Sequence, residues 1–348
     1  MPDAPIEAAV PDAACPLPPG GPLHAPTLTT NSILDVDEDI GIGCVLHGDG
    51  HVLCRGYGFN GTRGDGTSDR SIAERLAITP IPGLDDVRSF DVSAYVGCAA
   101  RGDGTVWCWG DNFAARVHVD LPRAILRPTR IPGVEGAVKV VIGYLGIQAC
   151  AVLANGRVRC WGGTGADAPI PDDEGLAADL ALSGAHTACI LYRGDRGRCL
   201  GRDFPELTWP AGSVRQFSGR RSSACVLATE GTVSCWGYLT DTTLSPPQDV
   251  GVRCATSLAS GGSHSCVALT DGTVSCFGES FRGNLGVAED GRMGPVRVQG
   301  IDRVVQVFRG GISSCARRED GSVWCWGAGF LARDVGVPSP EVPVRIDW

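Results

Sequence analysis

The chain has 348 residues, 43% of them hydrophobic and 20% charged, with a formal net charge of −9. These values provide ample material for a core and exclude a largely disordered chain. The acidic balance argues against a nucleic-acid partner, which would require a basic surface. No apolar run reaches the roughly 18 residues of a membrane span, so we expect none.

Residues 1–26 are rich in Pro, Ala, Asp and Gly, and we expect a flexible tail or linker there. Their composition resembles the linkers that follow the lipid-anchored cysteine of some bacterial lipoproteins. That resemblance implies a bacterial source and a lipid anchor upstream of the chain. The start shows no secretory signal, so we interpret the sequence as a mature or trimmed form.

From residue 27 to residue 348 the chain is built from repeats. Seven pairs of cysteines share a spacing of ten positions, and each second cysteine is followed two positions later by glycine. Between that cysteine and glycine stands Trp in four repeats, Phe277 in one, and Arg55 and Leu200 in the other two. The pairs are Cys44 with Cys54, Cys98 with Cys108, Cys150 with Cys160, Cys189 with Cys199, Cys225 with Cys235, Cys266 with Cys276 and Cys315 with Cys325.

The ten-residue spacing predicts a β-hairpin. Six repeats carry glycine six residues after the first cysteine, as Gly272 does after Asp271. A three-residue hairpin loop needs its last residue in the left-handed region, where glycine costs least. The two cysteines then become cross-strand neighbours. In the fourth repeat Asp195 replaces this glycine, and we expect a distorted turn there.

Two further strand signals stand upstream of each hairpin, for example residues 304–308 and the Pro-bounded residues 295–298. Each repeat therefore offers about four short strands, the content of one blade of an all-β propeller. The C-terminal residues 343–348 copy the Pro-bounded segment with no repeat after them, and the first repeat lacks a clear copy. We therefore expect the last strand to complete the first blade and close the ring.

Residues 260–286 and the glycine-rich residues 60–67 resemble the repeat of the regulator-of-chromosome-condensation family. The resemblance extends over roughly residues 30–348 and implies a seven-bladed β-propeller. The paired cysteines are similar to those of crinkly-type plant receptor kinases and of secreted bacterial members. A secreted bacterial propeller that inhibits β-lactamases by binding them with one face is a further relative by fold.

The fourteen paired cysteines favour cross-strand disulfides. Free buried thiols and metal sites are the alternatives, but two cysteines on a hairpin supply only two ligands, and no repeating His or third Cys completes a set. Cys15 and Cys254 remain. They could form a bridge that ties the tail to a late blade; otherwise Cys254 is a free buried thiol or Cys15 pairs elsewhere.

Five phenylalanines recur five residues after a second cysteine, in the variable loops that also hold two tyrosines and a tryptophan. One interpretation is a repeated core contact beneath each loop. The other is an aromatic surface for a partner, because loops on a rigid ring are common binding sites. The candidate partner-binding residues are Phe59, Phe113, Phe204, Phe281, Phe330, Tyr57, Tyr238 and Trp209.

No catalytic triad, His-Glu metal motif or phosphate-binding loop is evident. We therefore expect no catalytic residue, no metal and no cofactor. His186 and His264 stand in the family's Ser-Gly-x-(x)-His stretch, where we expect a structural hydrogen bond between strands or blades.

These observations favour a monomeric binding or scaffold protein, secreted, periplasmic or on the cell surface, that presents propeller loops to a protein or a glycan. The alternative is a propeller enzyme, a hydrolase or lyase with its site at the central channel mouth. A cluster of Asp, Glu, His or Tyr at that mouth would favour an enzyme, and an aromatic ring would favour binding. Guanine-nucleotide exchange is a third hypothesis. The acidic charge, the cysteines and the lack of a long insertion count against it.

Overall fold

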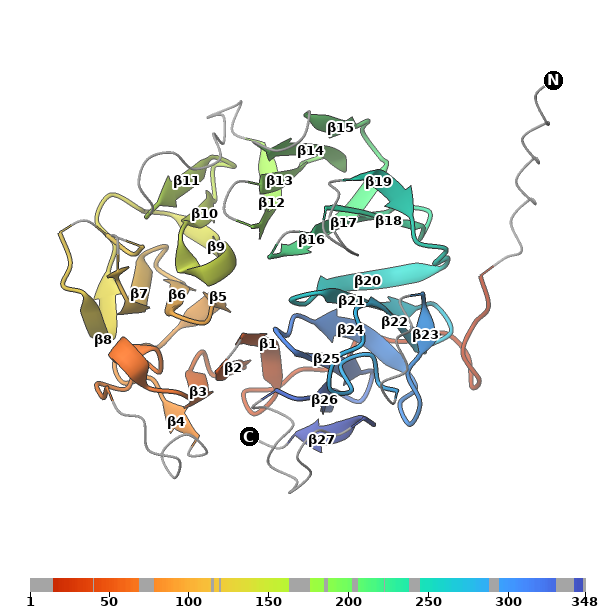
Figure 1. The fold of residues 1–348 in the computed structure, drawn as a ribbon, viewed down its shortest axis with the longest axis horizontal. Coiled ribbons are helices and arrows are strands. Elements are labelled where there is room, and N and C mark those ends of the chain that lie inside the picture. Colours follow the sequence, from red (N-terminus) through yellow and green to blue (C-terminus); the bar gives the residue numbers. More distant parts are fainter. Residues whose placement is uncertain are drawn as a thin grey trace.

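The computed structural model shows a closed ring of β-sheets around a central axis (Figure 1). It describes residues 15–39, 41–68, 78–113, 116–118, 120–162, 176–184, 187–201, 206–221, 223–237, 245–287, 294–329 and 341–346. The seven sheets follow one another along the chain, which confirms the all-β, seven-bladed propeller. Six blades have four strands, and the third has three among the described residues.

Each blade is an antiparallel meander that starts at the axis and ends at the periphery (Figure 1). The innermost strands are β1 (Ile33–Asp39), β5 (Val87–Val92), β9 (Ala137–Ile142), β12 (Ala177–Ser183), β16 (Val214–Arg220), β20 (Ala255–Ser260) and β24 (Val304–Phe308). The second strands are β2 (Ile42–His47), β6 (Val96–Arg101), β10 (Ala149–Leu153), β13 (Thr187–Tyr192), β17 (Ser223–Ala228), β21 (His264–Leu269) and β25 (Ser313–Arg318).

The third strands carry the second cysteine of each pair, and the outermost strands follow them. The third strands are β3 (Val52–Gly56), β7 (Val106–Asp111), β11 (Val158–Trp161), β14 (Arg196–Gly201), β18 (Val233–Gly237), β22 (Val274–Gly278) and β26 (Val323–Gly327). The outermost are β4 (Thr79–Pro80), β8 (Ala124–Arg130), β15 (Leu207–Trp209), β19 (Ser245–Asp249), β23 (Val296–Arg297) and β27 (Val344–Ile346). Two 3-10 turns are η1 (Phe59–Gly61) and η3 (Tyr144–Gly146).

The expectation that the C-terminal strand completes the first blade is wrong. Strand β27 pairs with β26 of the seventh blade, where Val344 lies opposite Cys325. The first blade obtains its outer strand from its own repeat, because Thr79 lies opposite Cys54. In the six blades whose outer strand the structure describes, the Pro-bounded segment is thus the outer strand of the preceding blade.

The two cysteines of each pair lie directly opposite each other on the second and third strands of their blade. All seven pairs form disulfides, with Cα–Cα distances of 4.0 to 4.1 Å. These bridges join Cys44 to Cys54, Cys98 to Cys108, Cys150 to Cys160, Cys189 to Cys199, Cys225 to Cys235, Cys266 to Cys276 and Cys315 to Cys325. Cys15 and Cys254 form an eighth bridge. No free cysteine remains among the described residues.

The hairpin loops follow the predicted geometry. Gly272 has φ +77°, and its N–H donates to Leu269 O at 2.9 Å. The fourth loop is not distorted: Asp195 adopts φ +60° in place of the glycine and donates to Tyr192 O at 3.1 Å. An Asp tolerates the left-handed region better than most residues, so the loop keeps its length.

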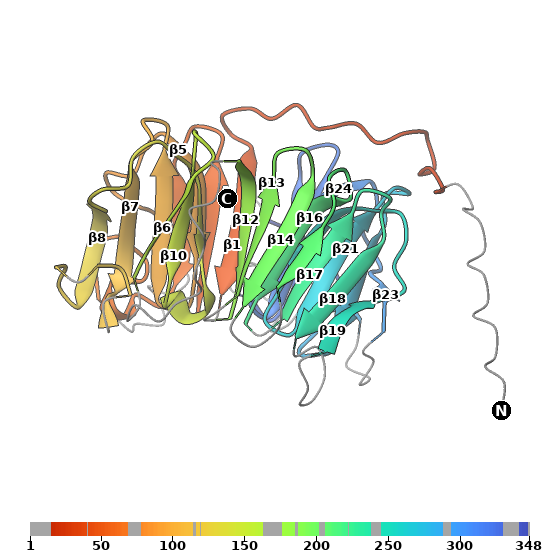
Figure 2. The same cartoon turned by 90° about the horizontal axis from the view of Figure 1, so that it is seen from above.

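The loops between second and third strands define one face of the ring, which we call the hairpin face. The loops that follow the third strands lie on the opposite face, called the loop face. Residues 15–32 run along the hairpin face over the sixth and seventh blades toward β1 (Figure 2). Residues 15–26, part of the expected flexible tail, are tied down there by the disulfide from Cys15 to Cys254 and by hydrogen bonds from Thr270 and Arg303 to the carbonyls of Pro16 and Pro19.

Candidate functional site

Polar side chains of the innermost strands link neighbouring blades around the axis. Asp37 of β1 accepts a hydrogen bond from Val92 N of β5 at 2.9 Å, and Asp91 of β5 accepts one from Ile142 N of β9 at 2.9 Å. Side chains at equivalent positions of other innermost strands accept the same kind of bond from the next blade. The pairs are Ser89 with Val140 N, Gln216 with Leu258 N, Ser218 with Ser260 N and Ser257 with Val307 N. These bonds fix one register between blades.

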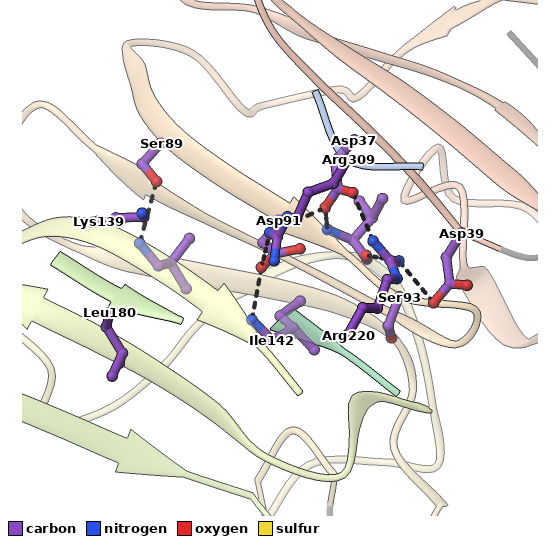
Figure 3. Close-up of polar contacts among 12 residues, drawn as sticks. Asp37, Asp39, Ser89, Asp91, Ser93, Lys139, Ile142, Leu180, Arg220 and Arg309 are labelled. Carbon is purple, nitrogen blue, oxygen red and sulfur yellow. Dashed lines mark hydrogen bonds and ion pairs between the residues drawn. The ribbon is translucent and has the colours of Figure 1, made fainter. Parts of the chain in front are cut away.

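Five charged residues, which we call the axial cluster, cross the channel toward its loop-face end (Figure 3). Arg220 at the end of β16 lies 3.1 Å from Asp37 and 2.8 Å from Asp39, both on β1. Arg309, directly after β24, lies 2.6 Å from Asp91 on β5. The side chains of Asp37, Asp39, Asp91 and Arg220 are at most 7% exposed. The axial cluster therefore ties the first, second, fifth and seventh blades together.

The pKa values of two carboxyls in the axial cluster, Asp37 and Asp91, shift in opposite directions. Burial, with the nearby Asp91 charge, raises the pKa of Asp37 to about 7. Burial also acts to raise the pKa of Asp91, but Arg309, a hydrogen bond from Asp37 and Arg220 outweigh it and lower that pKa. Two carboxyls this close cannot both ionise easily.

The enzyme hypothesis requires carboxylates at the axis. The carboxylates of the axial cluster are poorly placed to act on a substrate. Both oxygens of Asp37 are engaged, one by Arg220 and the other by Val92 N. Arg220 also donates to Val92 O at 3.2 Å. A general base must reach the proton that it abstracts, and this buried, paired carboxylate does not. We assign the axial cluster a structural role.

Aromatic and arginine side chains gather on the loop face of the second blade. Phe113 is 51% exposed. The guanidinium carbons of Arg116 and Arg123 lie 5.5 and 5.1 Å from its ring centre, and Arg116 also lies 4.8 Å from the ring centre of Tyr95. These distances are those of cation–π contacts. We call Tyr95, Phe113, Arg116 and Arg123 the blade-two patch.

Two other predicted aromatics are also exposed on the loop face. Phe281 is 40% exposed and has the guanidinium carbon of Arg282 at 5.0 Å from its ring centre. Tyr57 is 39% exposed and lies over Gly41 of the neighbouring turn. Phe59, in η1, is half-buried. Of the predicted set, these three aromatics and Phe113 are the ones that the structure places in loop-face segments.

The remaining predicted aromatics divide into two groups. Trp209 lies in β15, not in a loop, and its half-buried ring packs against Phe217 and Trp236 at 5.3 and 5.7 Å between centres. This position gives it a packing role and corrects the loop placement. Phe204, Tyr238 and Phe330 lie outside the described residues.

His264 is structural, as predicted. Its Nε2 lies 2.8 Å from Ser314 Oγ in the next blade, and burial lowers its pKa to about 4, so the ring is neutral at pH 7. His186 lies outside the described residues. Where the structure describes the chain, no group of three or more His, Cys, Asp or Glu could hold a metal ion. No helix in those ranges is long and apolar enough to cross a membrane.

Sequence reasoning missed both the axial cluster and the arginines of the blade-two patch. One signal was present: Asp35, Asp37 and Asp39 alternate along β1, so one face of an innermost strand is acidic. Arg220 and Arg309 carry no such signal, because their partners lie more than 180 positions away in the sequence. Arg116 and Arg123 stand in an irregular loop with no repeat to compare.

The sixth blade supplies the clearest family evidence. Residues 255–284, which span β20 to β22, match the model of the regulator of chromosome condensation (RCC1) repeat. The sixth blade carries an RCC1-type repeat. The tryptophan after the second cysteine also makes the same contact in two blades. Trp109 and Trp326 donate to the carbonyls of Thr62 and Asn284, each eight residues after the second cysteine of the preceding blade.

Three solved structures share the fold. Human WBSCR16 is 16% identical, with 86% of this chain and 94% of that chain covered and a TM-score of 0.66. Yeast RCC1 (Prp20), solved bound to Kap60, is 16% identical, with 98% and 91% covered and a TM-score of 0.66. The CRINKLY ectodomain of the Arabidopsis thaliana receptor kinase ACR4 is 16% identical, with 90% and 98% covered and a TM-score of 0.51. No curated protein sequence matches the chain.

Proposed function

We propose that the protein is an extracytoplasmic binding or scaffold module that presents its loop face to a protein partner. The blade-two patch is the main support for this proposal. In it, the exposed Phe113 is flanked by two arginines on a propeller whose blades each contain a disulfide. Aromatic and arginine side chains dominate binding energy at protein interfaces. A rigid frame also reduces the entropy lost on binding.

The charge of the patch defines the partner. Although the whole chain carries −9, the blade-two patch contributes Arg116 and Arg123, the second of which lies 3.8 Å from Asp111. Charge complementarity selects a partner surface with carboxylates around an apolar side chain. A glycan that stacks on Phe113 is the alternative partner.

The disulfides support an oxidising compartment. Eight disulfides and no free cysteine among the described residues are typical of secreted or surface proteins. The test is thiol counting on denatured protein without reductant. We expect almost no reactive thiols; fourteen or more would refute both the disulfides and the extracytoplasmic location.

The partner is tested by affinity capture with the intact oxidised protein from the surface or secreted fraction. The triple variant Phe113→Ala, Arg116→Ala, Arg123→Ala removes the patch. Val138→Ala is the matched control, because Val138 is also 51% exposed but lies on β9 at the hairpin face. We expect a specific partner that the wild type and the control retain and the patch variant loses.

Two results would contradict the proposal. One is a partner that the patch variant binds as well as the wild type does. The other is the absence of any partner together with clear hydrolase or lyase activity, which would favour the enzyme hypothesis.

A further inference from the structure

A ring of polar residues surrounds the hairpin-face end of the channel. Each innermost strand contains a register shift near its start, such as the one between Ile33 and Asp35. The residue that follows each bulge is polar in all seven blades. These residues are Asp35, Ser89, Lys139, Asp179, Gln216, Ser257 and Gln306.

A cavity of about 190 Å³ lies on the axis inside this ring and is lined by residues of all seven innermost strands. Its rim is accessible, since the side chains of Lys139 and Asp179 are 38% and 31% exposed. Asp37 and Arg309 of the axial cluster line it on the loop-face side, and their side chains are 4% and 23% exposed. The cavity is therefore a polar pocket whose most exposed charged side chains lie toward the hairpin face.

Most charges of this pocket are already paired. Lys139 pairs with Asp179, and Arg309 pairs with Asp91. Asp35 is the exception: its Oδ1 accepts a hydrogen bond from Val36 N at 2.9 Å, and it forms no ion pair within the described residues. Arg317 donates to the carbonyls of Ile33 and Leu34 instead.

The electrostatics at Asp35 favour a cation. Burial, with the Asp37 charge, raises its pKa to about 6. The charged groups around it are Asp37 on its own strand, Lys139 on β9, Arg309 after β24 and Arg317 on β25. Arg309 and Lys139 act to lower the Asp35 pKa, but burial outweighs them. An ammonium group placed in the cavity would satisfy this carboxylate.

We propose that the axial pocket binds a small primary amine, with its ammonium group on the carboxylate of Asp35. A 150 Å³ cavity holds a six-carbon ring, so this pocket suits a ligand of about six to eight heavy atoms. The polar lining, including Gln306 and the Lys139–Asp179 pair, favours an ammonium that donates hydrogen bonds. This site is independent of the proposed loop-face function, because it lies at the opposite face.

The test is calorimetric titration of the intact oxidised protein with putrescine, using 1,4-butanediol as its neutral isostere. We expect saturable binding of putrescine at neutral pH and none of butanediol. Asp35→Asn should weaken putrescine binding by about tenfold or more, the value of a hydrogen bond to a charged group. Asp85→Asn, an equal charge change at an exposed hairpin-face site, should leave it unchanged.

The pH dependence gives a second readout. The amine stays protonated from pH 5 to pH 8, whereas Asp35 gains its proton as pH falls through about 6. Binding should therefore weaken below that pH in the wild type and not in Asp35→Asn. The proposal is overturned if putrescine does not bind, if butanediol binds equally, or if Asp35→Asn binds as the wild type does.

Discussion

At the scale of single residues, Asp35 illustrates a side chain that opposes folding at neutral pH. Its pKa in the folded protein is about 6, above the ordinary 3.8. The folded state therefore holds the proton more tightly than the unfolded state does. The stability of the wild type should fall as pH rises from about 4 to about 6, because ionisation costs more in the folded state.

Asp35→Asn should remove this penalty, since the amide oxygen can still accept the hydrogen bond from Val36 N. Without added amine, the variant should be more stable than the wild type by about 1 to 2 kcal/mol at neutral pH, after a discount for partial exposure. The difference should vanish near pH 4. Melting temperatures across this pH range measure it, and an equal difference at every pH would contradict the assignment.

Trp326 tests the contact between the sixth and seventh blades. The ring is fully buried, and its Nε1–H donates to Asn284 O at 3.0 Å. Trp326→Ala should cost about 3 to 5 kcal/mol, mainly through the cavity that it leaves. Trp326→Phe should cost only about 1 kcal/mol, because Phe277 fills the same position in the sixth blade and Asn284 O keeps its bond from Ser314 Oγ. Thermal unfolding compares the two; equal losses would show that ring volume does not decide the effect.

At this scale the sequence shows which residues occupy repeated positions, but not which groups their side chains contact. The tryptophan that follows four of the second cysteines is visible as a repeat, but the acceptors of Trp109 and Trp326 in the preceding blade are not. Likewise, the exposure of Phe113 and the half-burial of Phe59 differ although both occupy the same register. The sequence could not distinguish them, because the difference depends on the irregular loops around each ring.

At the scale of elements, the hairpin loops also connect neighbouring blades. The carbonyl of Gly272 accepts a hydrogen bond from Val304 N, the first residue of the next innermost strand, at 2.9 Å. Asp195 O accepts one from Val214 N at 3.0 Å. The left-handed residue thus turns its carbonyl toward the next blade. This requirement explains why the fourth loop keeps its geometry without glycine.

Two substitutions of Asp195 separate backbone conformation from side-chain chemistry. Asp195→Ala should destabilise the protein by about 1 kcal/mol, because a β-carbon is costly at φ +60°. Asp195→Gly should be neutral or stabilise by up to about 1 kcal/mol. Thermal unfolding of both variants without reductant is the measurement. If glycine is the more harmful of the two, the left-handed conformation is not what limits this position.

The hairpins, cysteine pairs and strand number could be predicted because the hairpin contacts are local in sequence, from Cys44 opposite Cys54 to Ile42 opposite Gly56, and each strand leaves its own local pattern. The assignment of the outer strand could not, since a Pro-bounded segment between two hairpins can pair with either. The structure assigns it to the preceding blade, as Thr79 opposite Cys54 shows. This choice alone overturns the predicted ring closure.

At the scale of the whole molecule, the seventh and first blades are neighbours in the ring that do not follow each other along the chain. A backbone bridge between Asp37 and Arg309 joins them. Side chains do so too: Ser313 Oγ donates to Glu38 at 2.6 Å, and Arg317 donates to the carbonyls of Ile33 and Leu34. The chain enters the first blade from the tail, which is bonded through Cys15 to Cys254 at the start of the sixth blade. The disulfide therefore spans the discontinuous junction covalently and acts as a clasp.

The double variant Cys15→Ser, Cys254→Ser should open this clasp. The bond encloses a sequence separation of 239 residues, for which the chain-entropy model gives about 5 kcal/mol. Because the tail retains some freedom, we expect a loss of about 2 to 4 kcal/mol. It should appear as a lower melting temperature and as faster amide exchange in β1 and β24.

The control for the clasp is Thr270→Val, which removes the hydrogen bond from Thr270 Oγ1 to Pro16 O but keeps the disulfide. A surface change of this kind should alter stability by no more than about 0.5 kcal/mol. If both variants melt as the wild type does, the side-chain contacts alone close the ring. If exchange rises in the tail but not in β1 and β24, the disulfide anchors the tail without stabilising the junction. A coupled increase in β1 and β24 would show that this disulfide stabilises the junction between the seventh and first blades.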